Sequence, residues 1–489
     1  MDYITVDLGT TNIKVAAYDQ SLSLKGWKSV AVEYERANGF CEFDVDAYTD
    51  QIYKMISNMV SEGVIESLSV SRIVFTGQAE SLVVLDEDKK PLMNAISWMD
   101  GRSEDECGFL GTVFSEEEFY KKTGQLAIIP TWPAAKILWI KNNSQELHSR
   151  IKHYVLLKDY VVYKFTGILC ADCSIATFSF YFDIWNKCYW KEMCKICGID
   201  VEKLPSLTEP CTDIGPLSQQ AAFKCGLHDK TIVNNGTLDH FAGMIGSGNI
   251  ETGIMSLSTG TVMALATIAP SPVNSDTKMA LHYGFIPGTY VYLLVAESGG
   301  ANLEWYKNMF MPDISYNDMN EKLEDRSLPN EVIFLPYIDG TNSPEYDENA
   351  SGLFYGLKIK HDRLDLAYAV MEGVAMMLAK NVEALQDAGV SISRIIATGG
   401  GAKSEIWCQL QADMSGVPIQ IPEDKEAANL GAAIIGAVAD GSYKDYTQAV
   451  QKAVGFERTY HNKTNDIMIR KRTQFDLLYK AMIEANRLK

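Results

Sequence analysis

The sequence predicts an α/β protein of two domains that repeat one structural plan. A turn with a Gly-Thr pair joins two strand-like runs near residue 9 and again near residue 260. After each turn come a helical stretch and a strand that ends in glycine. The same order of elements in both halves indicates a diverged internal duplication, and the glycine-bearing turns predict a nucleotide site assembled twice over.

In the first half, Gly9, Thr10 and Thr11 lie between two strand-like apolar runs. Backbone N–H groups and hydroxyls in such a turn can approach phosphate oxygens, because no large side chain intervenes. Apolar residues recur at helical spacing over residues 46–60, and a strand-like run with its turn follows at 73–78.

The second half has the same elements. Gly260 and Thr261 lie within the strand-like stretch 254–265. A helical pattern over residues 364–385 leads into the apolar run and triple glycine of residues 395–401. Either turn alone is an ordinary hairpin, but the repeated context favours phosphate binding.

The composition limits the class of protein. The chain has 489 residues, 47% of them hydrophobic, which is enough for two substantial cores. The net charge of −19 argues against nucleic acids and anionic membranes, because both attract basic surfaces. No apolar run reaches the length of about 18 residues that a membrane span needs. Strand-like sequence begins at Tyr3 without a basic region before it, so we expect no signal peptide and a cytoplasmic protein. The sequence does not decide the oligomeric state, and a homodimer is one possible state.

Four of the ten cysteines, in two Cys-x2-Cys pairs, have the spacing of a structural zinc site: Cys170, Cys173, Cys194 and Cys197. The aromatic residues at 178–185, between the pairs, are typical of a core strand and not of a zinc-ribbon loop. We therefore expect these cysteines to be small buried hydrophobic residues that hold no metal.

Two stretches resemble the signatures of the FGGY family of carbohydrate kinases, namely residues 133–143 and residues 352–357 with their continuation at 365–372. The resemblance extends over essentially the whole chain. It departs from the family at Thr131, the opening position of the first signature, which is usually an aromatic residue or glycine. The resemblance implies two ribonuclease H-like domains of the actin and sugar-kinase superfamily, with a nucleotide cleft between them.

This resemblance also implies a division of tasks. The N-terminal domain, residues 1–247, would hold the sugar, the first phosphate loop and the catalytic base. The C-terminal domain, residues 248–489, would hold the second phosphate loop and the adenosine. We place the crossing near residue 247 because the stretch 236–248 is rich in small residues.

The resemblance further implies ATP and Mg²⁺ as cofactors, and two aspartates with named roles. Asp239 matches the base that accepts the sugar hydroxyl proton, although without the resemblance it is typical of a helix cap. Asp7 matches the strand-end carboxylate that organises Mg²⁺, through water, beside the phosphates. Its spacing alone also fits a residue that closes a hairpin turn.

The remaining nucleotide contacts implied by the resemblance are glycines, small residues and threonines. The residues expected to face the phosphates are Gly9, Thr10, Thr11, Gly260, Thr261 and Gly300. Gly300 begins a helix, whose unpaired N–H groups favour an anion. The residues expected along the adenosine are Gly400, Gly401 and Ala402.

The residues expected in the sugar site are Gln78, Glu80, Trp98, Asp100, Asp239 and His240. Ala79 and Thr131 stand where glycerol kinases carry an arginine and a tyrosine, which argues against glycerol. Glu80 stands where xylulose kinases carry a histidine. As a buried carboxylate it would accept hydrogen bonds from adjacent hydroxyls and repel a substrate carboxylate.

These residues together lead to one expected function and its alternatives. We expect a kinase that phosphorylates a small neutral sugar, with a ketopentose such as xylulose as first candidate. Another polyol, a hexulose or gluconate is the alternative substrate. A non-catalytic ATP-binding protein, working by domain closure like actin or a chaperone, is the alternative of another class.

Overall fold

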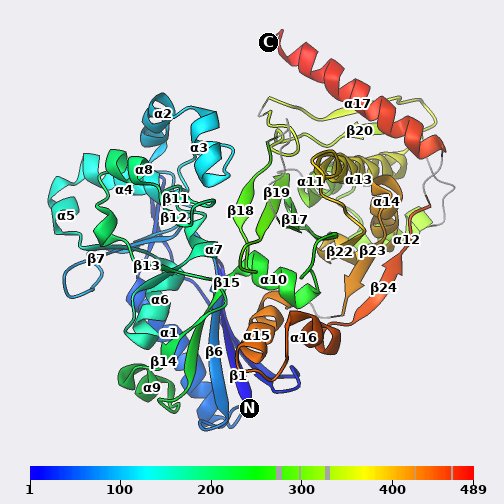
Figure 1. The fold of residues 1–489 in the computed structure, drawn as a ribbon. Coiled ribbons are helices and arrows are strands. Elements are labelled where there is room, and N and C mark those ends of the chain that lie inside the picture. The colour runs from blue at the N-terminus through cyan, green and yellow to red at the C-terminus, as the bar shows by residue number, and fades with distance from the viewer. Residues whose placement is uncertain are drawn as a thin grey trace. The chain divides into compact units, whose positions relative to one another are not determined.

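A computed structural model describes residues 1–270, 278–296, 299–324, 331–347, 349–423, 426–463 and 466–488. Within these ranges the chain forms two compact units of mixed α and β structure, which confirms the predicted fold class (Figure 1). Unit 1 comprises Met1–Ile250, Ala280–Val291 and Glu426–Val454, and unit 2 comprises Glu251–Met279, Tyr292–Lys425 and Gly455–Lys489. The first change of unit lies close to residue 247, but the chain returns to unit 1 twice, so the compact units are not continuous segments.

Unit 1 is built on a six-stranded sheet with the order β14-β15-β6-β1-β2-β3. β1, β6 and β15 run parallel to one another, whereas β2, β3 and β14 pair antiparallel with their neighbours. A second, five-stranded sheet has the order β4-β5-β8-β7-β9. The strands of unit 1 are β1 (Asp2–Leu8), β2 (Asn12–Asp19), β3 (Leu24–Ala31), β4 (Glu35–Ala37), β5 (Phe40–Phe43), β6 (Val70–Gly77), β7 (Leu82–Leu85), β8 (Ala95–Ile96), β9 (His153–Leu156), β10 (Cys170–Asp172), β11 (Phe182–Asp183), β12 (Cys188–Tyr189), β13 (Ser206–Thr208), β14 (Asp213–Pro216), β15 (Ile232–Leu238) and β18 (Leu281–Tyr283).

Helices cover the sheets of unit 1, and the first long one was expected at residues 46–60. It forms as α1 (Val45–Ser61), where the Asp44 side chain caps the first turn and the apolar face is buried against β2 and β3. The helices of unit 1 are α1, α2 (Glu104–Val113), α3 (Glu116–Thr123), α4 (Pro133–Asn143), α5 (Gln145–Arg150), α6 (Leu157–Thr166), α7 (Cys173–Ala176), α8 (Lys191–Cys197), the 3₁₀ turn η1 (Val201–Lys203), α9 (Gln219–Cys225), α10 (Asp239–Ser247), α15 (Ala427–Ala439) and α16 (Tyr446–Ala453).

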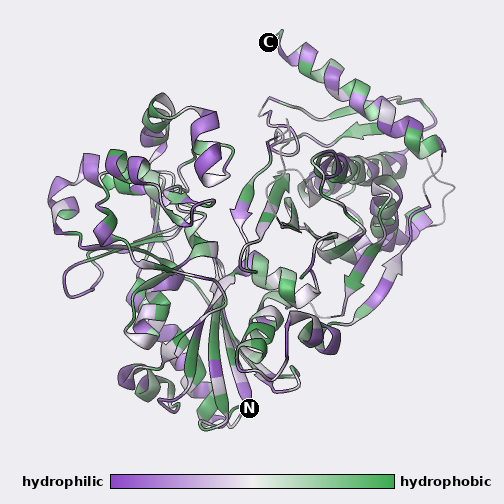
Figure 2. Cartoon of the chain, viewed as in Figure 1, coloured by the Kyte–Doolittle hydropathy of each residue, from purple (hydrophilic) through white to green (hydrophobic). Residues whose placement is uncertain are grey.

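Two helices far apart in the sequence, α10 and α15, pack closely within unit 1 and are mostly hydrophobic (Figure 2). The contact depends on two glycines. A Cβ atom at Gly246 would lie 1.8 Å from the Ala427 carbonyl oxygen, and one at Gly431 would lie 1.8 Å from the Ala242 carbonyl oxygen. Because the backbones approach this closely, the segment Glu426–Val454 belongs to unit 1 and supports the helix that begins at Asp239.

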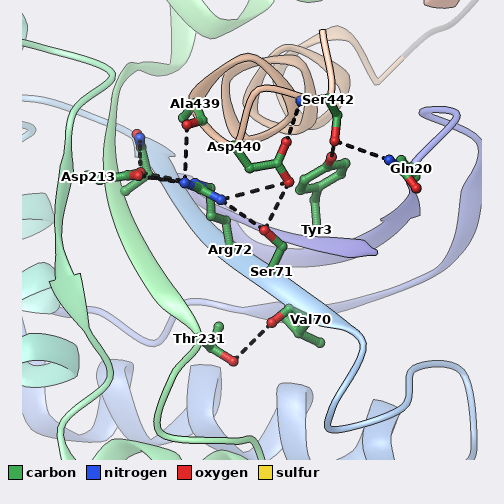
Figure 3. Close-up of polar contacts among 11 residues, drawn as sticks. Tyr3, Gln20, Val70, Ser71, Arg72, Asp213, Thr231, Ala439, Asp440 and Ser442 are labelled. Atoms are coloured by element: carbon green, nitrogen blue, oxygen red, sulfur yellow. Dashed lines mark hydrogen bonds and ion pairs between the residues drawn. The ribbon is translucent and has the colours of Figure 1, made fainter.

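Polar contacts fix the other end of α15 to the sheet (Figure 3). Arg72 on β6 donates to Asp213 on β14 at 2.8 Å and to the Ala439 carbonyl oxygen at 3.1 Å. The neighbouring Ser71 donates to Asp440 at 2.9 Å. These bonds lie at the start of β6, at the opposite end of that strand from Gly77, and they stabilise unit 1.

Unit 2 repeats the plan of unit 1. β16 pairs antiparallel with β17 and parallel with β22, as β1 does with β2 and β6. Over the strands of this unit the order is β19-β17-β16-β22-β23-β24. The strands are β16 (Ile254–Thr259), β17 (Met263–Ala269), β19 (Tyr290–Ala296), β20 (Ile333–Leu335), β21 (Leu353–Tyr355), β22 (Arg394–Gly399), β23 (Ile419–Pro422) and β24 (Phe456–Tyr460). The helices are α11 (Gly300–Phe310), α12 (Tyr316–Glu324), α13 (Arg363–Asp387), the 3₁₀ turn η2 (Gly401–Lys403), α14 (Glu405–Ser415) and α17 (Asp466–Asn486).

One expected element was wrong in type. Residues 178–185 were expected to form a core strand, but only Phe182 and Asp183 do so. Phe180 has a φ angle of 65°, a left-handed conformation that interrupts an extended strand. The segment 178–184 is nevertheless buried, because its aromatic side chains pack into unit 1.

Candidate active site

Three parallel strands of unit 1 end in register at one edge of the sheet. Leu8 at the end of β1 faces Gly77 on β6, and Gly77 faces Leu238 at the end of β15. The segments that follow are 9–11, 78–80 and 239–240. The structure therefore brings together the expected first phosphate loop, part of the expected sugar site and the candidate base, at the strand ends where α/β sheets commonly bind ligands.

The pKa values of Asp7 and Asp239, which lie at this edge, are shifted in opposite directions. Burial raises the pKa of Asp7 to about 7, and the negative charge of Asp239 adds to the rise while Lys14 opposes it. Burial would also raise the pKa of Asp239, but hydrogen bonds from His240 and its charge outweigh burial and hold that pKa below the usual value. Asp239 is therefore the carboxylate that stays ionised at neutral pH.

His240 contacts one oxygen of Asp239. Its backbone N–H donates to Oδ1 at 2.6 Å, and its ring Nδ1 lies 3.0 Å from the same oxygen. The side chains are 32% and 51% exposed for Asp239 and His240, respectively, so both are accessible to a small molecule. Asp239 is also the first residue of α10, whose N-cap is Leu238, and the amide that its carboxylate binds belongs to the second helical residue, His240.

The loop at 9–11, where phosphate contacts were expected, is tightly held around Gly9. A Cβ atom there would lie 2.4 Å from the Asn12 carbonyl oxygen, so only glycine fits. The Thr10 carbonyl oxygen accepts from the Tyr34 hydroxyl at 2.9 Å. Thr11, beside it, is exposed. The loop thus presents small groups on a fixed backbone.

Trp98 joins the expected sugar site to this loop. Its indole Nε1 donates to Thr10 Oγ1 at 2.9 Å, and its backbone N–H donates to Ser81 Oγ at 3.2 Å. Ser81 donates to Gln78 Oε1 at 2.7 Å, and Gln78 Nε2 donates to the Gly9 carbonyl oxygen at 3.4 Å. These hydrogen bonds connect the expected sugar-site residues Gln78 and Trp98 with the loop at 9–11. The sequence had not indicated this connection.

Asp100 has a different environment from the one expected. Its side chain is fully buried, and its two oxygens accept from Arg102 and, at 2.5 Å, from the Cys41 backbone N–H. The expectation was that Asp100 lies in the sugar site. In the structure its carboxylate instead holds Arg102, which also contacts Glu42 at 2.6 Å.

Glu80 and Lys136 are two titratable residues that interact in the interior of unit 1. Glu80 has a φ angle of 60°, and its carbonyl oxygen accepts from Lys136 Nζ at 3.2 Å. The same ammonium donates to the Ser97 carbonyl oxygen at 2.9 Å. Burial raises the pKa of Glu80 and lowers the pKa of Lys136, while their mutual attraction opposes both shifts. Lys136 was not identified from the sequence; the signal was a lysine inside the apolar run of α4.

In unit 2, a pocket of about 390 Å³ opens at the corresponding edge of the sheet. β16 and β22 end there in register, with Thr259 facing Gly399. The lining residues are Thr259, Gly260, Thr261, Gly300, Leu303, Glu304, Tyr316, Asn317, Met319, Asn320, Gly400, Gly401, Lys403, Ser404 and Trp407. Gly260, Thr261, Gly300, Gly400 and Gly401 were expected nucleotide contacts, whereas Ala402 is not among the lining residues.

Gly300 has another local role than the expected one. Its N–H donates to the Gly260 carbonyl oxygen at 2.8 Å, and the next amide, of Ala301, donates to the Thr261 carbonyl oxygen at 3.0 Å. These amides are therefore not unpaired groups that wait for an anion. A Cβ atom at Gly300 would lie 2.4 Å from the Gly260 oxygen, so glycine is needed for close packing of α11 on the loop.

The helices α12 and α14 supply residues of this pocket that the sequence had not indicated. Tyr316, Asn317 and Asn320 come from α12, and Trp407 comes from α14. Ser404 donates to Asn320 at 3.0 Å and so joins the two sides. In the sequence these residues look like any other residues on the face of a helix, so no periodic pattern indicates a binding role. Only the fold places them next to a glycine loop.

The comparison with known families identifies both halves. Residues 2–246 match the N-terminal domain, and residues 255–439 the C-terminal domain, of the FGGY family of carbohydrate kinases. The chain belongs to the FGGY family of carbohydrate kinases. It is therefore a phosphotransferase of a family that uses ATP.

Relatives of this FGGY kinase include enzymes for two sugars. It is 27% identical to a xylulose kinase of Bacillus subtilis over 97% of this chain and 95% of the relative. It is also 27% identical to a gluconokinase of the same organism, over 92% and 90%. Among solved structures, a xylulose kinase of Brucella ovis has a TM-score of 0.90 at 26% identity, covering 100% of both chains. A gluconate kinase of Lactobacillus acidophilus has a TM-score of 0.88 at 25% identity, covering 100% of this chain and 98% of the other.

Two further findings concern the kinase outside this site. Cys170, Cys173, Cys194 and Cys197 are buried free thiols, and within the described ranges no group of three or more His, Cys, Asp or Glu side chains is placed to hold a metal ion. No helix in the part of the chain that the structure describes is long and apolar enough to span a membrane.

Proposed function

We propose that this FGGY kinase transfers the γ-phosphoryl group of ATP to a hydroxyl of a neutral ketose, with a ketopentose such as xylulose as the first candidate. The observation that carries the proposal is Asp239. It is accessible, ionised at neutral pH, and placed beside the glycine loop and Asp7 at one sheet edge. A base for the attacking hydroxyl is what phosphoryl transfer needs most from a side chain.

Asp239 acts through Oδ2 in this proposal, because Oδ1 already accepts from His240. The sugar hydroxyl gives its proton to Oδ2 as its oxygen forms a bond to the γ-phosphorus. The bond from the γ-phosphorus to the bridging oxygen breaks, and ADP leaves with that electron pair.

Asp7 fits the role of organising Mg²⁺. Burial and the charge of Asp239 raise the pKa of Asp7 because both disfavour its ionised form. A cation next to the carboxylate would stabilise that form and so offset both effects. Magnesium ions typically bind one or two carboxylates together with phosphate oxygens and water. Bound there, the ion would neutralise charge on the phosphates.

The pocket of unit 2 is the proposed adenosine site. Gly400 and Gly401 leave room for the nucleotide, and Trp407 and Tyr316 supply aromatic surface. The glycine loops at 9–11 and 260–261 would face the phosphates. With a net charge of −19, the protein would bind ATP through backbone donors and the metal.

The choice of sugar rests on Glu80 and on the relatives. Burial raises the pKa of Glu80 to about 8, and in its ionised form this carboxylate would accept from two adjacent hydroxyls, which favours a neutral ketose or polyol. Gluconate is the second candidate, because gluconokinases are relatives at the same 27% identity as the Bacillus subtilis xylulose kinase.

The test is an ADP-coupled assay with pentuloses, hexuloses, polyols and gluconate, each with Mg²⁺ and ATP. We expect the highest kcat/KM for a neutral ketose. A higher kcat/KM for gluconate would contradict the proposed substrate, and ADP release independent of any sugar would contradict sugar phosphorylation.

A further inference from the structure

Strand β15 carries a β-bulge directly before the candidate base. Asn234 pairs with Val74 and Thr237 pairs with Thr76, so Asn235 and Gly236 together face one residue of β6. A bulge bends the strand and re-aims the residues that follow it. Gly236 has a φ angle of 57°, and a Cβ atom there would lie 1.8 Å from a carbonyl oxygen of β6.

The bulge leaves backbone groups that the sheet ladder does not satisfy. The N–H groups of Asn235 and Gly236 and the carbonyl of Gly236 bond within β15 and the loop at 211–212. The remaining group, the Asn235 carbonyl oxygen, accepts from Lys158 Nζ at 2.5 Å. Because a buried unpaired carbonyl is unfavourable, the shape of the bulge depends on this ammonium.

Lys158 is itself held in place from the opposite side. It lies on α6, its side chain is fully buried, and its ammonium is 2.9 Å from Asp172 Oδ2, which is also fully buried. Ser174 donates to the same carboxylate at 2.7 Å, and its hydroxyl lies 2.8 Å from Thr237 Oγ1. The network thus contacts β15 on both sides of Gly236 and two residues before Asp239.

We propose that Lys158 is a positioning residue for the base, acting with Asp172: it fixes the bulge at Asn235 and Gly236 and thereby the direction of Asp239. This inference rests on the proposed role of Asp239. Lys158 does not contact the substrate, so its loss lowers kcat and leaves ATP affinity unchanged.

The experiment compares K158M with K164M. Both lysines lie on α6, but Lys164 pairs with Asp46 at 2.8 Å on the surface, 31% exposed. We expect K158M to lower kcat by about 10²-fold, the effect of a displacement of about 1 Å in a reacting group, with little change in the KM for ATP. K164M should behave as wild type.

The double variant K158M/D172N separates positioning from stability. It removes both charges of the Lys158–Asp172 ion pair, so Asp172 is not left as an unpaired carboxylate beside the buried Asp159, as it is in K158M. Its melting temperature should return toward that of wild type while kcat stays low, because the Asn235 carbonyl still lacks its donor. Wild-type kcat in a folded K158M or K158M/D172N protein would overturn the proposal.

The background of D239N distinguishes the two proposals. If Lys158 acts through Asp239, K158M changes the residual rate of D239N by less than about twofold, because the effects of residues that act as a unit are not additive. A full loss in K158M on top of D239N would contradict positioning. Normal turnover in D239N would instead contradict the role of Asp239 as base.

Discussion

The proposed base, Asp239, has one carboxylate oxygen bound by His240, and its side chain is 32% exposed. D239N keeps the shape and removes the ability to accept a proton. We expect kcat to fall by about 10²–10⁴-fold, the usual contribution of a general base. Isothermal titration should give an unchanged dissociation constant for an ATP analogue. A kcat near that of wild type would mean that Asp239 only shapes the start of α10.

Glu80 is the residue on which the proposed choice of sugar rests. At a pH above the pKa of Glu80, where the side chain is ionised, E80Q should weaken sugar binding by about 1.5–3 kcal/mol, the range for a hydrogen bond to a charged group, while the KM for ATP stays constant. Since burial raises the pKa of Glu80, the wild-type KM for sugar should also fall as the pH rises through that pKa and the carboxylate forms. E80Q should lack this pH dependence. An unchanged sugar KM in E80Q would move selectivity to the segment 98–102.

At the scale of elements, two adjacent glycines at the end of β22 have different tasks. A Cβ atom at Gly401 would lie 2.7 Å from Thr259 Cβ, whereas one at Gly400 would come no closer than 3.7 Å to that residue. G401A should therefore destabilise the loop by about 1–3 kcal/mol, as overpacking does. G400A should keep the melting temperature.

The ATP dissociation constant then tests the adenosine assignment. If Gly400 lies against the nucleotide, G400A weakens ATP binding without a change in thermal stability, and G401A lowers both. Unchanged ATP affinity in G400A would place the nucleotide elsewhere in the pocket. Gly416, which has nothing within 4 Å of an added Cβ but a φ angle of 72°, is no substitute as control, because its backbone would be strained.

The elements were predictable where the signal was periodic and local. α1 and α13 begin and end within two residues of the expected helices, because their apolar spacing and caps lie within the segment. The glycine loops were predictable because the same turn occurs twice. The prediction of a strand at 178–185 was wrong. Its aromatic residues are buried by tertiary packing around Phe180, whose left-handed backbone conformation strand propensity does not encode.

The site was predictable to the extent that its residues lie in the turns after parallel strands. The buried lysines were not, because a single lysine in an apolar helix gives no indication of which carbonyl it will meet. Lys136 and Lys158 both donate to backbone carbonyl oxygens next to candidate site segments. Asp100 was expected in the sugar site from the resemblance, which did not show that Arg102 and the Cys41 amide bind its carboxylate.

At the scale of the whole molecule, the ionised form of Asp7 that the proposed metal role needs lowers the free energy of unfolding. Its carboxyl has a pKa of about 7 in the folded protein and the ordinary value of 3.8 as reference for the unfolded chain. Between these values the folded state binds the extra proton, so the wild type loses stability as the pH rises from about 4 to 7. D7N has no such group. We expect D7N to be more stable than wild type by about 1–4 kcal/mol at pH 8, and the two to be equal below about pH 4.

Chemical denaturation of both proteins across pH 4–8 measures this difference, and kcat measured alongside should be strongly reduced in D7N. Mg²⁺ with an ATP analogue should narrow the gap at pH 8, because the cation stabilises the ionised carboxyl only in the wild type. A lower stability of D7N at pH 8 would mean that Asp7 is a structural residue that closes the hairpin of β1 and β2. In that case the metal would be organised by another group.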